Sequence, residues 1–167
     1  MINWNNIIEN LKNGKEITVD PKIWNSDNLE YKKIYDSWVS CNFNLSSIKW
    51  INYYPEANFD KSVCTDLCRS LGIKMHRAWI SRLDPGYFAP WHWDVDDNIE
   101  EYKSYGDIRR FSIFIGEPHP AHFFVTDNKV FSNTPQGTVY EWIEFDSWHA
   151  GANAGLHSKY MLHLLGY

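Results

Sequence analysis

The sequence predicts a mainly β protein with flanking helices, in which short strands form an antiparallel sandwich or jelly roll. From about residue 74 onward, short apolar runs are separated by Gly, Pro, Asn and Asp, whereas apolar residues before that point recur at helical spacing. The chain has 167 residues, of which 44% are apolar and 17% aromatic. That length suits one core. We therefore expect a single domain over 1–167, with helical and loop support over about 1–73 and a β core over about 74–167.

Helical periodicity and stop signals predict three helices in the first part of the chain. Their expected spans are residues 4–11, about 26–38 and about 60–71. Ser26 is the expected N-cap of the second helix. The residues of that helix available for burial are Leu29, Ile34 and Trp38. Gly72 is placed to end the third helix.

Short runs rich in β-branched and aromatic residues predict seven strands. These strands are expected at residues 48–53, 75–83, 87–94, 109–115, 121–125, 137–144 and 159–165. Asp84-Pro85-Gly86 predicts a tight turn, and Thr126 to Lys129 predicts a hairpin tip. The number of short strands is what favours a sandwich or jelly roll.

Charge and cysteine content exclude several classes of protein. The net charge is −5 and no Lys/Arg block is present, so there is no strong nucleic-acid signal. The three cysteines, Cys41, Cys64 and Cys68, form neither an even disulfide framework nor a zinc spacing, and Cys64 and Cys68 are interpreted as small core residues. No apolar run approaches the ~20 residues that span a bilayer. We expect a reduced, cytoplasmic protein with no membrane partner.

The most informative motif is His92-Trp93-Asp94, followed far downstream by His149. Side chains alternate along a strand, so His92 and Asp94 are expected on one face. A second histidine from a distant strand would complete a site of two His and one carboxylate, the ligand set of non-haem Fe(II) oxygenases. By itself, a His-x-Asp pair is more typical of two side chains on an exposed surface than of a metal site, and the surrounding residues are what favour the metal site.

Basic residues on two predicted strands raise a further question. Lys159 lies ten residues after His149 and shares a strand face with Met161 and His163. A buried lysine is costly without an anion, so Lys159 is expected either at an exposed sheet end or beside a carboxylate. Of Arg109 and Arg110, one must point inward if their strand is packed on both sides.

Together these motifs resemble the Fe(II)- and 2-oxoglutarate-dependent dioxygenases, and in detail the aspartyl/asparaginyl β-hydroxylase-like branch. The resemblance covers about residues 75–167. It is carried in order by Ser81 to Gly86, Pro90 to Asp94, Arg110 to Ile113, His149 to Asn153, and Lys159.

The resemblance implies a double-stranded β-helix, the cupin-like form of the jelly roll, with Fe(II) held by His92, Asp94 and His149. It also implies cosubstrate contacts from Ser81, Arg110, Ser112 and Lys159. Lys159 and Ser81 match the residues that bind the C5 carboxylate of 2-oxoglutarate, while Arg110 and Ser112 match an Arg-x-His pair near its other end. The activity implied is hydroxylation of a C–H bond with O2, releasing succinate and CO2.

The chain departs from the β-hydroxylase branch at three of these positions. Ser112 replaces the usual His, and Lys159 replaces the usual Arg and is similar to the lysine of prolyl hydroxylases. Asp94 supplies a metal carboxylate that animal members of the branch lack. Because of these departures the substrate is not carried over, and a peptidyl residue or a small molecule remain open.

Two other functions are compatible with the same residues. One is a cupin-like metalloenzyme that does not use 2-oxoglutarate, for which Lys159 and Arg110 would be incidental. The other is a non-catalytic, metal-containing ligand-binding module.

The acidic run over residues 94–101 predicts a solvated loop or, alternatively, a mobile lid over residues 96–105. Core packing is the default expectation for Trp79, with a place at the border of the pocket as the alternative, because Trp79 shares a strand face with Ser81. Of the remaining histidines, only His163, on the face of Lys159, is expected to contact the pocket.

Overall fold

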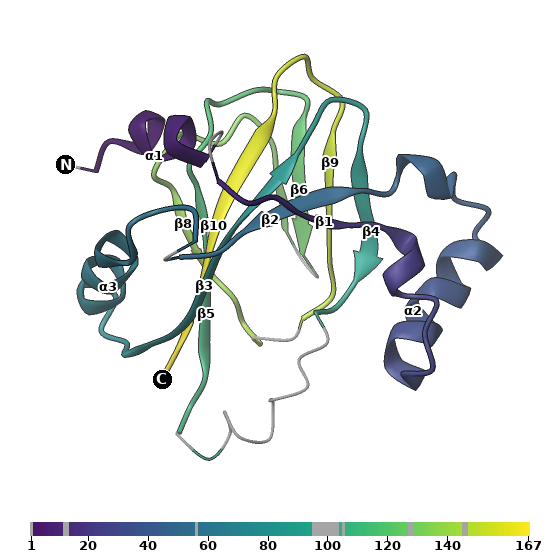
Figure 1. Ribbon diagram of the computed structural model, residues 1–167, viewed down its shortest axis with the longest axis horizontal. Coiled ribbons are helices and arrows are strands. Elements are labelled where there is room, and N and C mark those ends of the chain that lie inside the picture. The colour runs from purple at the N-terminus through teal and green to yellow at the C-terminus, as the bar shows by residue number, and fades with distance from the viewer. Residues whose placement is uncertain are drawn as a thin grey trace.

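The computed structural model describes residues 2–11, 14–55, 57–94, 104, 106–126, 129–144 and 147–167. Their strands form two sheets, of six and four strands, in which every paired strand runs antiparallel to its neighbour (Figure 1). The larger sheet has the order β1 (Ile17–Val19), β2 (Trp50–Tyr53), β3 (Met75–Leu83), β10 (Lys159–Gly166), β5 (Arg109–Phe114), β8 (Val139–Glu141). The smaller has the order β4 (Phe88–His92), β9 (His149–Asn153), β6 (His122–Thr126), β7 (Lys129–Phe131). The predicted mainly β, jelly-roll fold with flanking helices is confirmed.

Three α-helices precede β3 in the described residues: α1 (Trp4–Leu11), α2 (Leu29–Ser40) and α3 (Lys61–Ser70). Short 3-10 turns lie at Pro21–Ile23 and Leu45–Ser47. In Figure 1, α1 and α3 lie toward one end of the larger sheet, and α2 lies at the opposite end beside β4. None of the described helices is both long and apolar enough to cross a membrane.

The helix ends correct two predictions. The N-cap of α2 is Asn28 rather than Ser26, because the Asn28 side chain accepts hydrogen bonds from the backbone N–H groups of the first turn. Leu29 is 73% exposed, since it begins the helix on the solvent side, whereas Ile34 and Trp38 are buried as predicted. Gly72 follows α3 with a φ of +70°, the left-handed conformation typical of a helix end.

The larger sheet is covered on both faces, and β10 lies at its centre between β3 and β5. On one face, Leu162 and Leu164 pack with residues of α1 and α3, including Leu11 and Cys64. On the other face, Met161 packs with aromatic residues of the smaller sheet and the β8 region. Because side chains alternate along β10, Lys159 and His163 lie on the same face as Met161, between the two sheets. That interior is where the candidate site lies.

Two of the three cysteines belong to this core. Cys64 and Cys68 are buried free thiols on α3, and burial raises their pKa values to about 12 and about 11. These values keep both thiols protonated at neutral pH, so their prediction as core residues is confirmed. Cys41 is exposed.

Among the described residues, three strands were not predicted: β1, β7 and β9. Two of them, β1 and β7, are only three residues long, and β9 is made of small and polar residues. Strand propensity therefore did not predict them. In addition, β4 ends at His92 instead of extending to Asp94. Its pairing with β9 is irregular between Ala89 and His92, where Pro90 has no N–H to donate.

The two predicted turns have different outcomes. The Asp84-Pro85-Gly86 turn is confirmed, because the Tyr87 N–H donates to the Asp84 carbonyl at 3.1 Å and Gly86 has a φ of +83°. Thr126 pairs with Lys129 across β6 and β7. The tip itself, residues 127–128, lies outside the described residues.

Replacing Ile113 by alanine should destabilise the fold by about 2–5 kcal/mol, because Ile113 is fully buried in β5 between β10 and β8. Urea denaturation followed by circular dichroism measures the change. Val130→Ala is the matched control, since Val130 is 69% exposed and its truncation should change the free energy of unfolding by less than about 0.5 kcal/mol. Equal stability of the two variants would contradict this assignment of the core.

Candidate functional site

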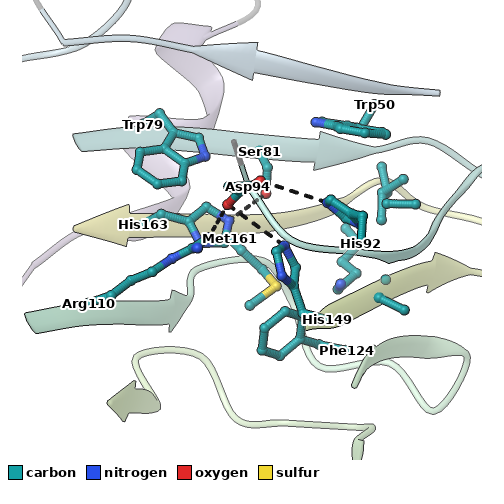
Figure 2. Close-up of a pocket in the computed structure, with 15 residues that line it drawn as sticks. Trp50, Trp79, Ser81, His92, Asp94, Arg110, Phe124, His149, Met161 and His163 are labelled. Atoms are coloured by element: carbon teal, nitrogen blue, oxygen red, sulfur yellow. Dashed lines mark hydrogen bonds and ion pairs between the residues drawn. The ribbon is translucent and has the colours of Figure 1, made fainter. Parts of the chain in front are cut away.

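His92, Asp94 and His149 converge between the two sheets, as the sequence predicted. His92 on β4 pairs directly with His149 on β9, and Asp94 lies two residues beyond the end of β4. The Nε2 atom of each histidine is 3.8 Å from an oxygen of the Asp94 carboxylate. One ligand atom from each of the three residues lies within 4.8 Å of the others. Figure 2 shows both imidazole rings directed toward the carboxylate.

The backbone holds each histidine in the tautomer that suits a metal ligand. The Nδ1 atom of His92 lies 2.6 Å from the Pro90 carbonyl oxygen, and that of His149 lies 3.1 Å from the Ser147 carbonyl oxygen. A carbonyl only accepts, so each Nδ1 carries the hydrogen and donates it. The Nε2 lone pairs therefore face the carboxylate and are free to bind a cation.

Aromatic packing restrains the two imidazole rings. The ring of His92 is surrounded by Trp24, Trp38 and Trp50, with ring centroids 5.4–6.3 Å away. The ring of His149 meets Trp142 edge to face at 4.8 Å. Ligand side chains whose rotamers are held by packing can keep a fixed geometry before any ion binds.

Electrostatics keep all three residues in the protonation states that bind metals. Burial lowers the pKa of His92 and of His149, so both imidazoles are neutral at pH 7. Burial alone would raise the pKa of Asp94, but the nearby positive charge of Arg110 outweighs it and holds that pKa below its usual range. Two neutral imidazoles and one carboxylate are a complete ligand set for a divalent cation.

Arg110 is the inward-pointing arginine of its pair. Its guanidinium is buried, donates to Asp94 at 2.5 Å and stacks on the Trp142 ring at 3.8 Å. Arg109 on the opposite face pairs with Glu141 at 2.7 Å. The structure thus places Arg110 against a ligand of the candidate metal site, where it orients the carboxylate.

The three residues fit a single metal ion. Metal–ligand bonds to His and carboxylate are about 2.0–2.2 Å long, so atoms 3.8 Å apart can both contact one ion. Three protein ligands from one side leave other positions open for a second ligand. That arrangement is suited to a catalytic metal rather than a closed structural site.

A pocket adjoins the three residues and encloses about 450 Å³ of space, including its open mouth. It is lined by Trp50, Trp79, Ser81, Leu83, Ala89, His92, Asp94, Arg110, Phe124, His149, Ala150, Gly151, Lys159, Met161 and His163. His163 borders the pocket as expected, and Trp79 borders it too, which was the alternative to core packing. The contributions of Trp50, Phe124 and Gly151 were not predicted.

Lys159 is buried in this pocket. The sequence predicted either an exposed sheet end or a neighbouring carboxylate for it, and neither is found among the described residues. It is 5% exposed, and within the described parts of the chain it forms no ion pair with a carboxylate. Its Nζ donates to the carbonyl oxygen of Phe123 at 2.8 Å. Burial lowers the pKa of Lys159 to about 7. Glycine at position 151 leaves room beside it, since a Cβ there would lie 3.4 Å from Nζ.

Ser81 lines the pocket, and Ser112 lies behind it. The Oγ atom of Ser81 is 2.9 Å from Nε2 of His163, and that of Ser112 is 2.9 Å from Nδ1 of the same ring. Ser112 is fully buried and is not part of the pocket wall. Direct contact between Ser112 and a ligand, as the motif implied, is therefore not supported by its position.

The acidic run beyond Asp94 lies outside the described residues. The same holds for the predicted lid over 96–105 except residue 104, so this hypothesis stays a prediction.

No protein-family model and no curated protein matches the chain. Among solved structures, it is similar to a viral collagen prolyl hydroxylase from Paramecium bursaria chlorella virus 1 in complex with 2-oxoglutarate, with a TM-score of 0.50, 10% identity and coverage of 93% of this chain and 97% of that chain. A Pseudomonas putida prolyl-4-hydroxylase matches with a TM-score of 0.46 and 10% identity over 98% of this chain and 99% of that one. A predicted oxalate decarboxylase from Thermotoga maritima matches with a TM-score of 0.42 and 12% identity over 71% and 80%. At these identities the likeness shows the fold alone, a cupin-like jelly roll.

Proposed function

We propose that this protein is an Fe(II)- and 2-oxoglutarate-dependent oxygenase that hydroxylates a C–H bond of a peptidyl residue or small molecule. The observation that carries the proposal is Lys159, a buried cation without a carboxylate partner among the described residues, in the same pocket as His92, Asp94 and His149. A buried ammonium group is stabilised by an anion. A dicarboxylate between Lys159 and the three metal-binding residues would supply that anion and a metal ligand together.

The chain's own residues would then bind and orient the reactants. Lys159 and Ser81 would hold the C5 carboxylate of 2-oxoglutarate, and Arg110 would hold Asp94 in place for the metal. When bound, Fe(II) would supply the activation of O2 that is coupled to oxidation of 2-oxoglutarate to succinate and CO2. The fold shared with a viral prolyl hydroxylase solved with 2-oxoglutarate supports this cosubstrate.

The walls of the pocket fit an oxidation that must exclude water. Trp50, Phe124 and Met161 present apolar surface around the metal-binding residues. Such lining keeps bulk water away from reactive species and strengthens the interaction of Lys159 with an anion. Within the oxygenases, the motif order favours the β-hydroxylase-like branch, with a lysine in the manner of prolyl hydroxylases.

Release of succinate tests the proposal. Purified protein is incubated with Fe(II), ascorbate, O2 and 2-oxoglutarate, and succinate is measured by mass spectrometry. We expect slow formation without a primary substrate, and none from protein loaded with Zn(II) in place of iron. If the iron-loaded protein binds neither 2-oxoglutarate nor its analogue N-oxalylglycine, the cupin-like or ligand-binding alternatives become the better interpretation.

The affinity for 2-oxoglutarate should fall as the pH rises above 7. Lys159 is mostly charged below its pKa of about 7, and a bound carboxylate would raise that pKa by favouring the charged form. Binding above pH 7 therefore takes up a proton, and the affinity should be about ten- to thirtyfold weaker at pH 8.5 than at pH 6.5. Calorimetric titration of the Mn(II) protein measures both the affinity and the proton uptake.

Lys159→Arg is the control for this pH dependence. A guanidinium stays charged across the range, so any binding that the variant retains should be nearly independent of pH. A wild-type affinity that is also independent of pH would show that Lys159 is not the partner of the carboxylate.

A further inference from the structure

A chain of hydrogen bonds runs across four neighbouring strands to the pocket. The indole Nε1 of Trp142, just after β8, donates to Oγ of Ser112 on β5 at 2.9 Å. Ser112 is bonded to Nδ1 of His163 on β10, and Nε2 of the same ring is bonded to Ser81 on β3, each at 2.9 Å. Ser112 and His163 are direct partners in the β5–β10 register. In Figure 2, His163 lies between Trp79 and the carboxylate of Asp94, with Ser81 behind.

The direction of donation along these hydrogen bonds follows from Trp142 and Ser112. An indole nitrogen only donates, so Ser112 accepts from Trp142. The Ser112 side chain is fully buried, and its own hydroxyl proton needs an acceptor. Among the described residues, the second partner of its hydroxyl is Nδ1 of His163. Donation from Ser112 to Nδ1 satisfies every group, whereas donation in the opposite direction would leave the hydroxyl proton of Ser112 unpaired.

The imidazole of His163 accepts from Ser112 and donates to Ser81. The ring is buried and stacked on Trp79 at a centroid distance of 4.9 Å, and a ring whose Nδ1 accepts a hydrogen bond is neutral. A neutral imidazole carries one hydrogen. With Nδ1 accepting, that hydrogen is on Nε2 and is donated to Ser81, so the hydroxyl proton of Ser81 is available for donation to an acceptor in the pocket that Ser81 lines.

We propose that Ser112 and His163 are positioning residues that make the Ser81 hydroxyl a hydrogen-bond donor to the ligand in this pocket. The ligand group beside Ser81 must then be an acceptor, such as a carboxylate. This inference rests on the proposed function for the identity of the ligand, but the direction of the hydrogen bonds rests on the protein alone. It also gives the serine at position 112 a role, because a hydroxyl can accept from Trp142 and donate to His163 at once.

The tautomer of His163 tests the proposal in the unaltered protein. Long-range 1H–15N correlation spectra of 15N-histidine-labelled, Zn(II)-loaded protein distinguish the protonated from the bare ring nitrogen, and loss of one set of peaks in His163→Gln assigns the ring. We expect hydrogen on Nε2 without any ligand. Hydrogen on Nδ1 would overturn the proposal. Because 2-oxoglutarate is absent, the result does not depend on whether the protein uses it.

A double-mutant cycle tests whether Ser112 acts through Ser81. Affinity for 2-oxoglutarate is measured by calorimetry on Mn(II) protein for wild type, Ser112→Ala, Ser81→Ala and the double variant. We expect Ser112→Ala to weaken binding by about three- to tenfold, the range for a neutral hydrogen bond, and to have no further effect once Ser81 is alanine. An equal effect in both backgrounds would mean that Ser112 acts by packing, and no effect in either would equally overturn the proposal.

The two measurements separate this proposal from the proposed function. Nε2 protonation together with undetectable 2-oxoglutarate binding in wild type would support the directed chain of hydrogen bonds and reject the cosubstrate. Nδ1 protonation together with tight 2-oxoglutarate binding would support the cosubstrate and reject the directed chain of hydrogen bonds.

Discussion

Replacing His149 by alanine is expected to weaken binding of a divalent metal by more than about a hundredfold. Loss of a residue that only supports a metal ligand costs about 10- to 100-fold in affinity, and loss of the ligand itself should cost more. His149 qualifies as a ligand because its Nε2 lies 3.8 Å from Asp94 while its Nδ1 is held by a backbone carbonyl. Competition titration of Mn(II) or Zn(II) against a fluorescent chelator measures the affinity.

The fold should survive this substitution, because the two sheets pack through aromatic and aliphatic residues that need no metal. His76→Ala is the matched control, since the His76 side chain is exposed and lies outside the pocket. It should bind metal like wild type. If the His149→Ala protein unfolds cooperatively and binds metal with wild-type affinity, the hypothesis of a metal site at these residues is contradicted.

Lys159→Met is expected to weaken 2-oxoglutarate binding by about ten- to a hundredfold while leaving metal affinity nearly unchanged. A hydrogen bond to a charged group contributes about 1.5–3 kcal/mol, which corresponds to that range. Arg110→Met provides the comparison. If Arg110→Met loses 2-oxoglutarate binding without losing metal and Lys159→Met does not, Arg110 holds the far carboxylate and the cosubstrate is reversed. If neither variant is affected, a metalloenzyme that does not use 2-oxoglutarate is favoured.

The same Lys159→Met substitution should stabilise the ligand-free protein. Burial moves the pKa of Lys159 from 10.5 down to about 7. At pH values below 7 the buried ammonium is charged, and this charge lowers the free energy of unfolding. That penalty shrinks as the pH rises from 7 to 10.5, where the unfolded chain binds the extra proton. We expect a gain of about 1–4 kcal/mol at pH 7, measured by urea denaturation. Loss of binding with a gain in stability would distinguish a functional lysine from a structural one.

Local sequence determined most of the secondary structure. The limits of α1 and β3 agree with the periodic pattern, because each contains a full amphipathic or β-rich run bounded by turn residues. The pattern failed where an element depends on its partners. β9 contains small residues that would not form a strand alone, and it exists because β4 and β6 hydrogen-bond to it on both sides.

For the candidate site, the sequence by itself determined the identities and order of the groups that can do chemistry. His92 and Asp94 are close in sequence, so their proximity is a local property. The pairing of His92 with His149, 57 positions later, depends on strand register, which the hydrophobic pattern alone does not specify.

Only the tertiary structure decided the surroundings of Lys159 and Ser112. Position in the sequence places Lys159 at the start of a strand, where either solvent or a carboxylate would be expected. The second sheet covers that end of β10 and removes it from water, and no carboxylate of the described residues lies against it. Ser112 faces His163 because β5 and β10 are neighbours in this register. Burial and cross-strand contacts arise from packing between distant segments, so composition and periodicity predict the residues but not the environment that sets their chemistry.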